Sequence, residues 1–171
     1  DNGIAIIEIH YGENIISELQ YDSIYHEHLF YFSLQSLQYL LNKHGLCAFD
    51  YNLSPISGGS IALYCSKDNR QATSKFKQKL EVDKNSGLDL KENWLEFADK
   101  CFDHKNKFIE IIHKFSNNQK KMIGYGASAR SSTLLNFCGI DYRDIVCIAD
   151  GNSIKHGKYT AGRENAGDQT I

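Results

Sequence analysis

The amino-acid sequence predicts an α/β chain. Three observations support this fold class: an apolar strand, a helix and a hairpin in the first third, a long amphipathic helix in the middle, and a strand–helix–strand unit near the end. Helical and strand periodicities that alternate in this way are typical of sheets covered by helices. We expect three parts, which span residues 1–67, 68–120 and 121–171.

The first part begins with an apolar run at residues 4–9, which predicts a strand. Leucines then recur at helical spacing over residues 34–41, and Gly45 stands where a helix ends. Two further apolar runs, at residues 46–53 and 60–66, are separated by a proline and a pair of glycines. They predict the two strands of an antiparallel hairpin.

The second part predicts a polar connector and a long helix. Residues 68–89 are polar, with a helical stretch around residues 72–80. Apolar side chains then recur at helical spacing from residue 90 to 115, at Trp94, Phe97, Cys101, Phe108, Ile112 and Phe115. We expect one amphipathic helix that bridges the flanking parts.

The third part carries a βαβ pattern. A short apolar strand leads through the turn GYGASAR into a helix, and the run DIVCIAD then predicts a second strand that ends at Asp150. The right-handed crossover rule predicts parallel pairing of residues 122–125 with residues 145–149. The tail at residues 160–171 is polar and has no strand or helix pattern, so we expect it to fray.

Composition disfavours several classes of partner and site. The net charge of −2 provides no basic face for nucleic acid or an anionic membrane, and no apolar run approaches the roughly 20 residues that cross a bilayer. The five cysteines are odd in number and mostly lie within apolar runs, which is typical of reduced core thiols in a cytoplasmic protein. A disulfide framework or a zinc site within this chain is therefore disfavoured.

The turn between the last strands predicts a site for a nucleotide. Glycines there let the backbone approach a diphosphate, the start of the helix offers N–H groups, and an acid at the end of the second strand can accept ribose hydroxyls. We assign substrate-binding roles to Gly124, Gly126, Ala127, Ser128, Arg130 and Asp150. The plainer interpretation is a tight turn that needs glycine for steric reasons, followed by serine capping and a solvated arginine.

The run YDSIYHEHLFYFS crowds two histidines and a glutamate among aromatic residues. His26 and His28 have no cysteine partner and no HExxH spacing to complete a zinc set, so metal binding is disfavoured. Histidine titrates near neutrality, a carboxylate can orient it, and a phenol can donate to an oxyanion. Acid–base chemistry by Tyr25, Glu27 and His28 therefore fits this segment better than metal binding does. The plainer interpretation is a surface loop before a helix, with the aromatic residues in the core.

These motifs resemble those of a known family. The segment YDSIYHEHLFYFSLQSLQYLLNKHGLCAFDYNLSPISGGSIALYCSK is similar to the active-site region of S-adenosylmethionine-dependent sugar C-methyltransferases, in which Tyr-x-Glu-His precedes FSL, a helix and a GGS hairpin. The segments GYGASARSSTLLNFCGI and IADGNSIKHGKYTAG are similar to that family's C-terminal domain. Ser57 stands where many relatives have His, and Arg130, Ser131 and Ser132 replace a common Lys-Gly-Asn, so the identity of the substrate stays open.

The resemblance implies a C-terminal fragment of a larger enzyme. Residues 1–67 would supply the closing strands and hairpin of a methyltransferase-type sheet, residues 68–120 a bridging helix, and residues 121–171 an incomplete Rossmann-like domain. Zinc would belong to a missing N-terminal domain, and S-adenosylmethionine would bind largely outside this chain. The isolated chain would therefore be inactive, although it would bind a nucleoside diphosphate sugar weakly.

The resemblance also implies a mechanism for a nucleotide-linked keto-sugar. A base removes the proton next to the ketone, and the resulting carbanion takes the methyl group. His28 would be the base, Tyr25 a donor near the enolate and Glu27 the residue that orients the site, with His26 as a flanking residue. Two alternatives remain, a fragment of an NAD(P)-dependent oxidoreductase and a non-catalytic nucleotide-sugar-binding domain. The sugar, the nucleotide base, the methylated carbon and the oligomeric state are not given by the residues.

Overall fold

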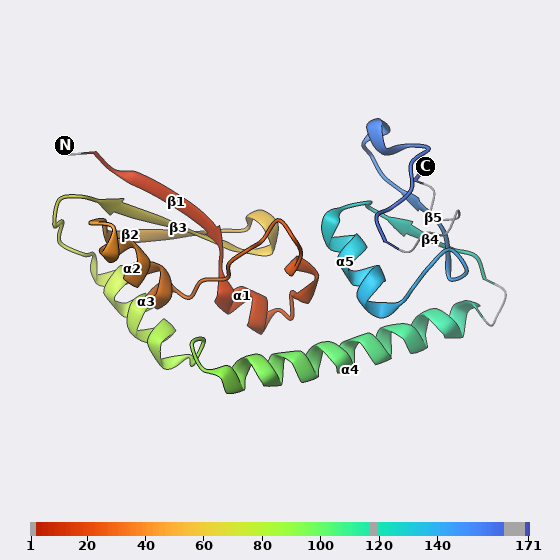
Figure 1. Ribbon diagram of the computed structural model, residues 1–171, viewed down its shortest axis with the longest axis horizontal. Helices are drawn as coiled ribbons and strands as arrows, with labels where there is room; N and C mark the ends of the chain where they lie inside the picture. The colour runs from red at the N-terminus through yellow and green to blue at the C-terminus, as the bar shows by residue number, and fades with distance from the viewer. Residues whose placement is uncertain (1–2, 117–119, 163–169) are drawn as a thin grey trace. The chain divides into compact units, whose positions relative to one another are not determined.

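The computed structural model describes residues 3–116, 120–162 and 170–171, and it confirms the predicted α/β class. Contacts between residues divide the chain into two units, each with its own sheet and helices (Figure 1). Unit 1 comprises Asp1–Gln20 and Leu29–Ala98, and unit 2 comprises Tyr21–His28 and Asp99–Ile171.

Unit 1 is built on a three-stranded antiparallel sheet. The strands are β1 (Ala5–His10), β2 (Cys47–Ser54) and β3 (Ser60–Ser66), and they lie in the order β1-β3-β2. Both neighbours of β3 run antiparallel to it. The opening strand and the hairpin that the sequence predicted are thus confirmed. A short 3₁₀ turn, η2 (Ile56–Gly58), and Gly59 with φ of 121° connect the hairpin strands.

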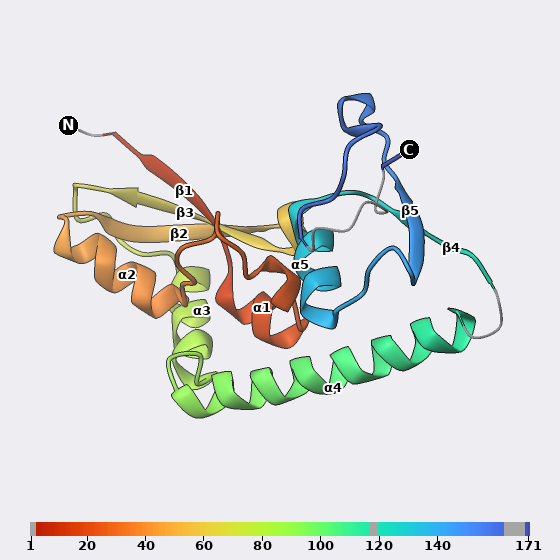
Figure 2. The same cartoon turned by 45° about the vertical axis from the view of Figure 1, so that its right-hand side comes forward.

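Two helices cover one face of this sheet, α2 (Leu34–Lys43) and α3 (Ser74–Asn85) (Figures 1 and 2). Ser33 caps α2 and Thr73 caps α3, each accepting a hydrogen bond from a backbone N–H in the first turn. The core between the helices and the sheet consists of Tyr11, Leu34, Leu37, Leu41, Ala48, Ile61, Leu63, Cys65 and Phe76. A short helix that follows β1, α1 (Gly12–Ser17), was not predicted.

The long helix α4 (Lys91–Ser116) confirms the predicted helix over residues 90–115. Its residues up to Ala98 belong to unit 1, and those from Asp99 belong to unit 2. The apolar stripe of the sequence is buried where it meets the rest of each unit: Phe97, Cys101 and Ile112 are all under 9% exposed.

Unit 2 contains the predicted βαβ element. Strands β4 (Met122–Tyr125) and β5 (Ile145–Ala149) pair in parallel, and α5 (Ala129–Cys138) connects them. This pairing confirms the prediction from the crossover rule. Ile112 of α4 packs with Cys138 and Ile140 in the core of this unit.

The tail of the chain follows its prediction only in part. Residues 163–169, where most of the predicted fraying falls, lie outside the described residues. For the last two residues the prediction is wrong, because Thr170 is 2% exposed and forms a parallel bridge with Ile148. The backbone N–H of Ile171 also donates to the Ile148 carbonyl at 2.9 Å.

The boundaries of the units differ from the predicted three-part division at one important place. Tyr21–His28, which carries the two histidines and the glutamate, belongs to unit 2 with the βαβ element. The segments on either side of it belong to unit 1. The assignment of residues 1–67 to a methyltransferase-type domain stays a prediction.

Candidate functional site

The segment Tyr21–His28, called here the histidine segment, is a succession of turns. It begins with the 3₁₀ turn η1 (Tyr21–Ser23), which packs against α5. The N–H of Ile24 then donates to the Tyr21 carbonyl at 3.0 Å, and the N–H of His28 donates to the Tyr25 carbonyl at 3.0 Å. These turns bring the ring of His28 close to Ser23 of η1.

Tyr25 and His28 lie together, as a catalytic pair would require. Their ring centroids are 4.5 Å apart, with the ring planes inclined at 41°. The Nδ1 atom of His28 lies 2.8 Å from the carbonyl oxygen of Ser23. A carbonyl oxygen only accepts hydrogen bonds, so Nδ1 carries the proton and Nε2 carries the lone pair in the neutral ring. The imidazole is thus held in the form that can act as a base through Nε2.

The remaining candidates of the segment are placed differently. Glu27 is exposed, and its carboxylate makes no hydrogen bond or ion pair with any residue of the described ranges. The observed orienting contact of His28 comes from the Ser23 carbonyl, whereas the role of Glu27 stays a prediction. His26 is also exposed, and its ring meets that of Tyr25 edge-on at 6.0 Å.

Two side chains anchor the histidine segment to the helices of unit 2. The hydroxyl of Tyr21 lies 2.8 Å from Nδ1 of His104 in α4, and its ring packs against Phe137 in α5 at 5.1 Å. Burial raises the pKa of Tyr21, so its hydroxyl stays protonated at neutral pH. Asp22 receives two hydrogen bonds from the Arg130 guanidinium, from Nε at 2.8 Å and from Nη2 at 2.9 Å.

A cavity of about 480 Å³ opens beside this segment. Tyr25 and His26 line it together with residues of α5 and of the loop that follows β5. The α5 residues are Ala129, Ser132, Thr133, Asn136 and Phe137, and the loop residues are Ala161 and Gly162. All of these residues belong to unit 2. Its lining combines amide and hydroxyl groups with aromatic rings, which is the usual composition of a small-molecule site.

The glycines of the turn after β4 have structural reasons of their own. A side chain on Gly124 would place Cβ 3.1 Å from Ile148 of the paired strand. Gly126 adopts φ of 91°, which side-chain-bearing residues rarely adopt, while the space around it is open. Its N–H donates to the Ala149 carbonyl at 2.7 Å. Glycine is therefore explained here by the turn itself, and a role in binding stays a prediction.

Asp150 lies at the end of β5, as expected, but its carboxylate closes the turn. Oδ2 accepts hydrogen bonds from the Ala127 N–H at 2.7 Å and from Lys155 Nζ at 2.9 Å, and Oδ1 accepts one from the Asn152 N–H at 2.8 Å. The bond from Lys155, with those from the two backbone N–H groups, lowers the pKa of Asp150 from 3.8 to about 2. Both oxygens are thus engaged within the protein, which leaves them poorly placed for a ribose.

Ser128 and Arg130 also bind partners within the chain. Ser128 forms a capping box with Ser131: each side chain accepts a hydrogen bond from the other's backbone N–H. Arg130 directs its guanidinium to Asp22. The N–H groups of Ala127 and Ser128, which the sequence suggested for a phosphate, therefore already have acceptors in this structure.

A second cavity of unit 2, of about 250 Å³, lies at the start of α5. Lys155 and Lys158 bring positive charge to it, and Ser128, Tyr159 and Thr160 bring hydroxyls. It shares Ala129, Ser132 and Ala161 with the larger cavity, so the two adjoin. The two lysines lie in the segment IADGNSIKHGKYTAG, but no binding role was assigned to them from the sequence, because no local pattern places them beside the start of α5.

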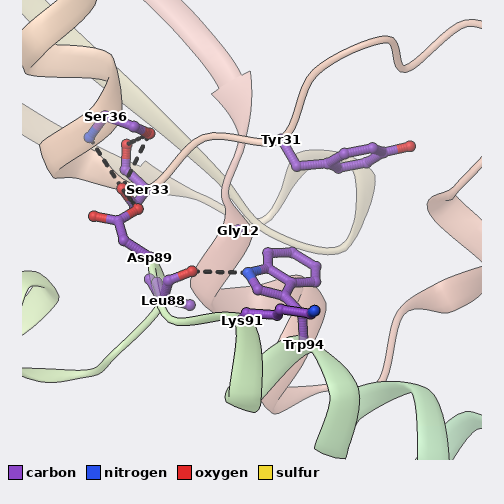
Figure 3. Close-up of a pocket in the computed structure, with 8 residues that line it drawn as sticks. All are labelled: Gly12, Tyr31, Ser33, Ser36, Leu88, Asp89, Lys91 and Trp94. Carbon is purple, nitrogen blue, oxygen red and sulfur yellow. Dashed lines mark hydrogen bonds between the residues drawn. The ribbon is translucent and has the colours of Figure 1, made fainter.

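Unit 1 has a separate cavity of about 490 Å³ at the start of α4 (Figure 3). Trp94 donates its indole N–H to the Leu88 carbonyl at 2.8 Å, and Ser33 donates to the Asp89 carboxylate at 2.8 Å. Tyr31 and Lys91 complete its polar lining. None of the candidate residues predicted from the sequence lines this cavity.

Across residues 3–116, 120–162 and 170–171, no three side chains of His, Cys, Asp or Glu gather as a metal site. Among the helices that the structure describes, none has the length and apolar character needed to cross a bilayer.

Comparison with known proteins agrees with the resemblance seen in the motifs. Residues 55–165 match the family model described as C-methyltransferase C-terminal domain. The chain is also similar to the C-methyltransferase NovU of Streptomyces niveus, with 29% identity over 163 residues. That similarity covers 94% of this chain and 39% of the relative, so the chain spans well under half the length of the curated relative that it matches.

Proposed function

Since the chain belongs to the family of C-methyltransferase C-terminal domains, we propose that it is the C-terminal portion of an enzyme that methylates carbon in a nucleotide-linked keto-sugar. The observation that carries this proposal is the Tyr25–His28 pair beside a cavity of about 480 Å³, with His28 held by the Ser23 carbonyl. S-adenosylmethionine, when bound, supplies an electrophilic methyl group. We assign its site, and any structural zinc, to parts of the enzyme outside this chain.

His28 is proposed as the base. A hydrogen on the carbon next to a ketone is acidic, because the electron pair left behind spreads onto the carbonyl oxygen. Nε2 of His28 takes this proton, the C–H bond breaks, and an enolate forms. The electron pair of that enolate would then form the C–C bond to the methyl group, while the methyl–sulfur bond breaks and its electron pair stays on the sulfur of the departing donor. The proton on His28 leaves to water before the next turnover. The bond from Nδ1 to the Ser23 carbonyl supports this role, because it stabilises the positive ring that forms.

Tyr25 is proposed as the donor to the enolate oxygen. Its ring lines the larger cavity and lies against His28, which is not itself among the residues that line that cavity. A ketone bound there would therefore lie near Tyr25. A phenol that donates to a developing oxyanion lowers the barrier of proton removal. Glu27 is exposed and is proposed to contribute only once the substrate or another part of the enzyme covers the segment.

The adjoining cavities suggest how the substrate lies. The sugar would occupy the larger cavity near Tyr25, and the diphosphate would occupy the smaller one, where Lys158 and the first turn of α5 offer positive charge. Lys155 is already bound to Asp150 and to the Ala127 carbonyl, so Lys158 is the better candidate for the phosphate.

The oxidoreductase alternative receives less support. A dinucleotide-binding turn needs its acid for the ribose hydroxyls, yet both oxygens of Asp150 accept hydrogen bonds from the protein. That alternative also leaves the Tyr25–His28 pair without a role. Titration of the chain with a nicotinamide dinucleotide and with a nucleotide sugar separates the two functions. The five cysteines are free, which fits our assignment of the protein to the reducing cytoplasm.

The proposal is tested by hydrogen exchange in the longer enzyme that contains this chain. With the methyl donor withheld, deuterium from heavy water should enter the keto-sugar at the carbon next to the ketone. His28→Gln should slow this exchange by about 10²–10⁴-fold, the usual contribution of a general base. His44→Gln serves as the matched control, because His44 is exposed at the end of α2. Normal exchange in a folded His28→Gln enzyme would refute the proposal.

A further inference from the structure

We infer that Arg130 and Asp22 are positioning residues, which hold the η1 turn so that its Ser23 carbonyl faces Nδ1 of His28. The inference rests on the proposed function, in which His28 is the base. It assigns Arg130 a role other than the phosphate contact that the sequence suggested. Asp22, Ser23 and His28 lie within one short segment, whereas Arg130 comes from α5.

The ion pair between Arg130 and Asp22 has a two-point geometry. Nε and Nη2 of Arg130 donate to different oxygens of Asp22, at 2.8 and 2.9 Å, which is the two-point grip of a guanidinium on a carboxylate. The two side chains are only 32% and 27% exposed. A planar pair of this kind fixes direction as well as distance, which a lysine ammonium cannot do. Asp22 is therefore held in one orientation relative to α5.

Tyr21 anchors the η1 turn beside this ion pair. Tyr21 is 8% exposed, and its hydroxyl lies 2.8 Å from Nδ1 of His104. Its ring packs against the half-buried Phe137 of α5, with the ring centroids 5.1 Å apart. Consecutive residues of η1 are thus tied to different helices of unit 2, to α4 through Tyr21 and to α5 through Asp22. A turn held at two adjacent residues has little freedom to rotate the peptide that follows.

Ser23 connects this turn to His28, the proposed base. Ser23 follows Asp22 directly and is fully buried, and its carbonyl accepts the hydrogen bond from His28 at 2.8 Å. If the turn rotated, this carbonyl would move away from Nδ1, and the ring would lose the contact that selects its tautomer. The proton could then reside on Nε2, where the base needs its lone pair. The ion pair therefore acts on the reaction through the tautomer of His28.

A purely structural ion pair would behave differently. Its loss would lower stability and leave the tautomer of His28 unchanged in the molecules that remain folded. A phosphate ligand would differ again, since its loss would raise KM for the nucleotide sugar. A positioning residue lowers kcat, and misplacement of a reacting group by about 1 Å can cost about 10²-fold.

The test reads the imidazole directly by NMR of the ¹⁵N-labelled chain. Long-range ¹H–¹⁵N spectra at about pH 8, above the ordinary histidine pKa of about 6.5, report which nitrogen carries the proton. The signals of His28 are assigned by their loss in His28→Gln. In the unmodified chain His28 should show a proton on Nδ1 alone. In Arg130→Lys, Arg130→Gln and Asp22→Asn it should show a mixture of both tautomers.

Arg143→Lys is the matched control. The guanidinium of Arg143 also donates to both oxygens of a carboxylate in unit 2, that of Asp141. This second ion pair lies within the loop that follows α5. The control variant should keep the proton of His28 on Nδ1. In the longer enzyme, Arg130→Lys should lower kcat with little change in KM.

The results for the Arg130 variants either support or overturn the positioning role. A proton that stays on Nδ1 in folded Arg130→Lys and Arg130→Gln chains would overturn the inference, and so would a rise in KM without a fall in kcat. If Arg130→Gln does not fold, Arg130→Lys carries the test, and a failure of both to fold would show that Arg130 serves the fold alone. A failure of the proposed function would be seen in the exchange experiment instead. The His28→Gln enzyme would then exchange deuterium at the normal rate, while the NMR results for the Arg130 variants would stay as expected.

Discussion

The bond between Tyr11 and Asp83 offers the most direct test of how unit 1 is held together. Tyr11 follows β1 and is fully buried, and its hydroxyl donates to the carboxylate of Asp83 in α3, which is 2% exposed. Burial and the neighbouring carboxylate raise the pKa of Tyr11, so the hydroxyl remains a donor throughout the neutral range. The other carboxylate oxygen accepts the Gln35 N–H at 3.1 Å.

Tyr11→Phe removes the hydroxyl and keeps the ring. Asp83 would then remain buried with one backbone donor, that of Gln35. A hydrogen bond to a charged group contributes about 1.5–3 kcal/mol, so we expect the free energy of unfolding of unit 1 to fall by about 2 kcal/mol. With a urea dependence of about 1–3 kcal/mol per M, the midpoint should fall by roughly 1 M.

Trp94 provides the assay, because it is the only tryptophan of the chain and lies in unit 1. Urea unfolding followed by its fluorescence reports this unit without a signal from unit 2. Tyr64→Phe is the control, since the Tyr64 hydroxyl accepts only an exposed hydrogen bond from Asn52 among the bonds described. Its loss should change stability by less than about 0.5 kcal/mol. Equal midpoints for the two variants would refute the reasoning about Tyr11.

Two further predictions concern groups that titrate. Burial raises the pKa of three thiols, and it raises that of Cys101 to about 11. Iodoacetamide should therefore label the half-buried Cys47 and Cys147 first. Equal labelling rates for all five cysteines in the folded chain would contradict this prediction. The slow group comprises Cys65, Cys101 and Cys138. The pKa of Asp150 is lowered in the folded chain, so its contribution to stability is present above pH 3.8 and is lost as the pH falls through about 2. The Ala127 amide signal should follow this transition in an NMR titration, and a midpoint near 3.8 would show that the turn does not hold the carboxylate.

Local sequence patterns determined much of the fold. The spacing of the leucines and Gly45 predicted α2, the glycine-bounded apolar runs predicted the β2–β3 hairpin, and the crossover rule predicted the parallel β4–β5 pair. These features arise from contacts between residues close in the chain, through helical periodicity, turn conformations and the handedness of a βαβ unit. Tyr25 and His28 were proposed as site residues in the same way, because the chemical signal lies within one short segment, and their catalytic role stays a prediction.

Tertiary structure decided what surrounds those candidates. Asp22 and Arg130 are 108 positions apart, and no local pattern connects them. The same holds for the Ala127 N–H, which binds Asp150 instead of remaining open to a phosphate. It also holds for the histidine segment, which belongs to unit 2 although both of its neighbours in the chain belong to unit 1. The physical reason is that a charged group or a buried donor pairs with whichever group the folded chain brings within hydrogen-bond distance. Which group that is depends on how whole helices and strands pack together.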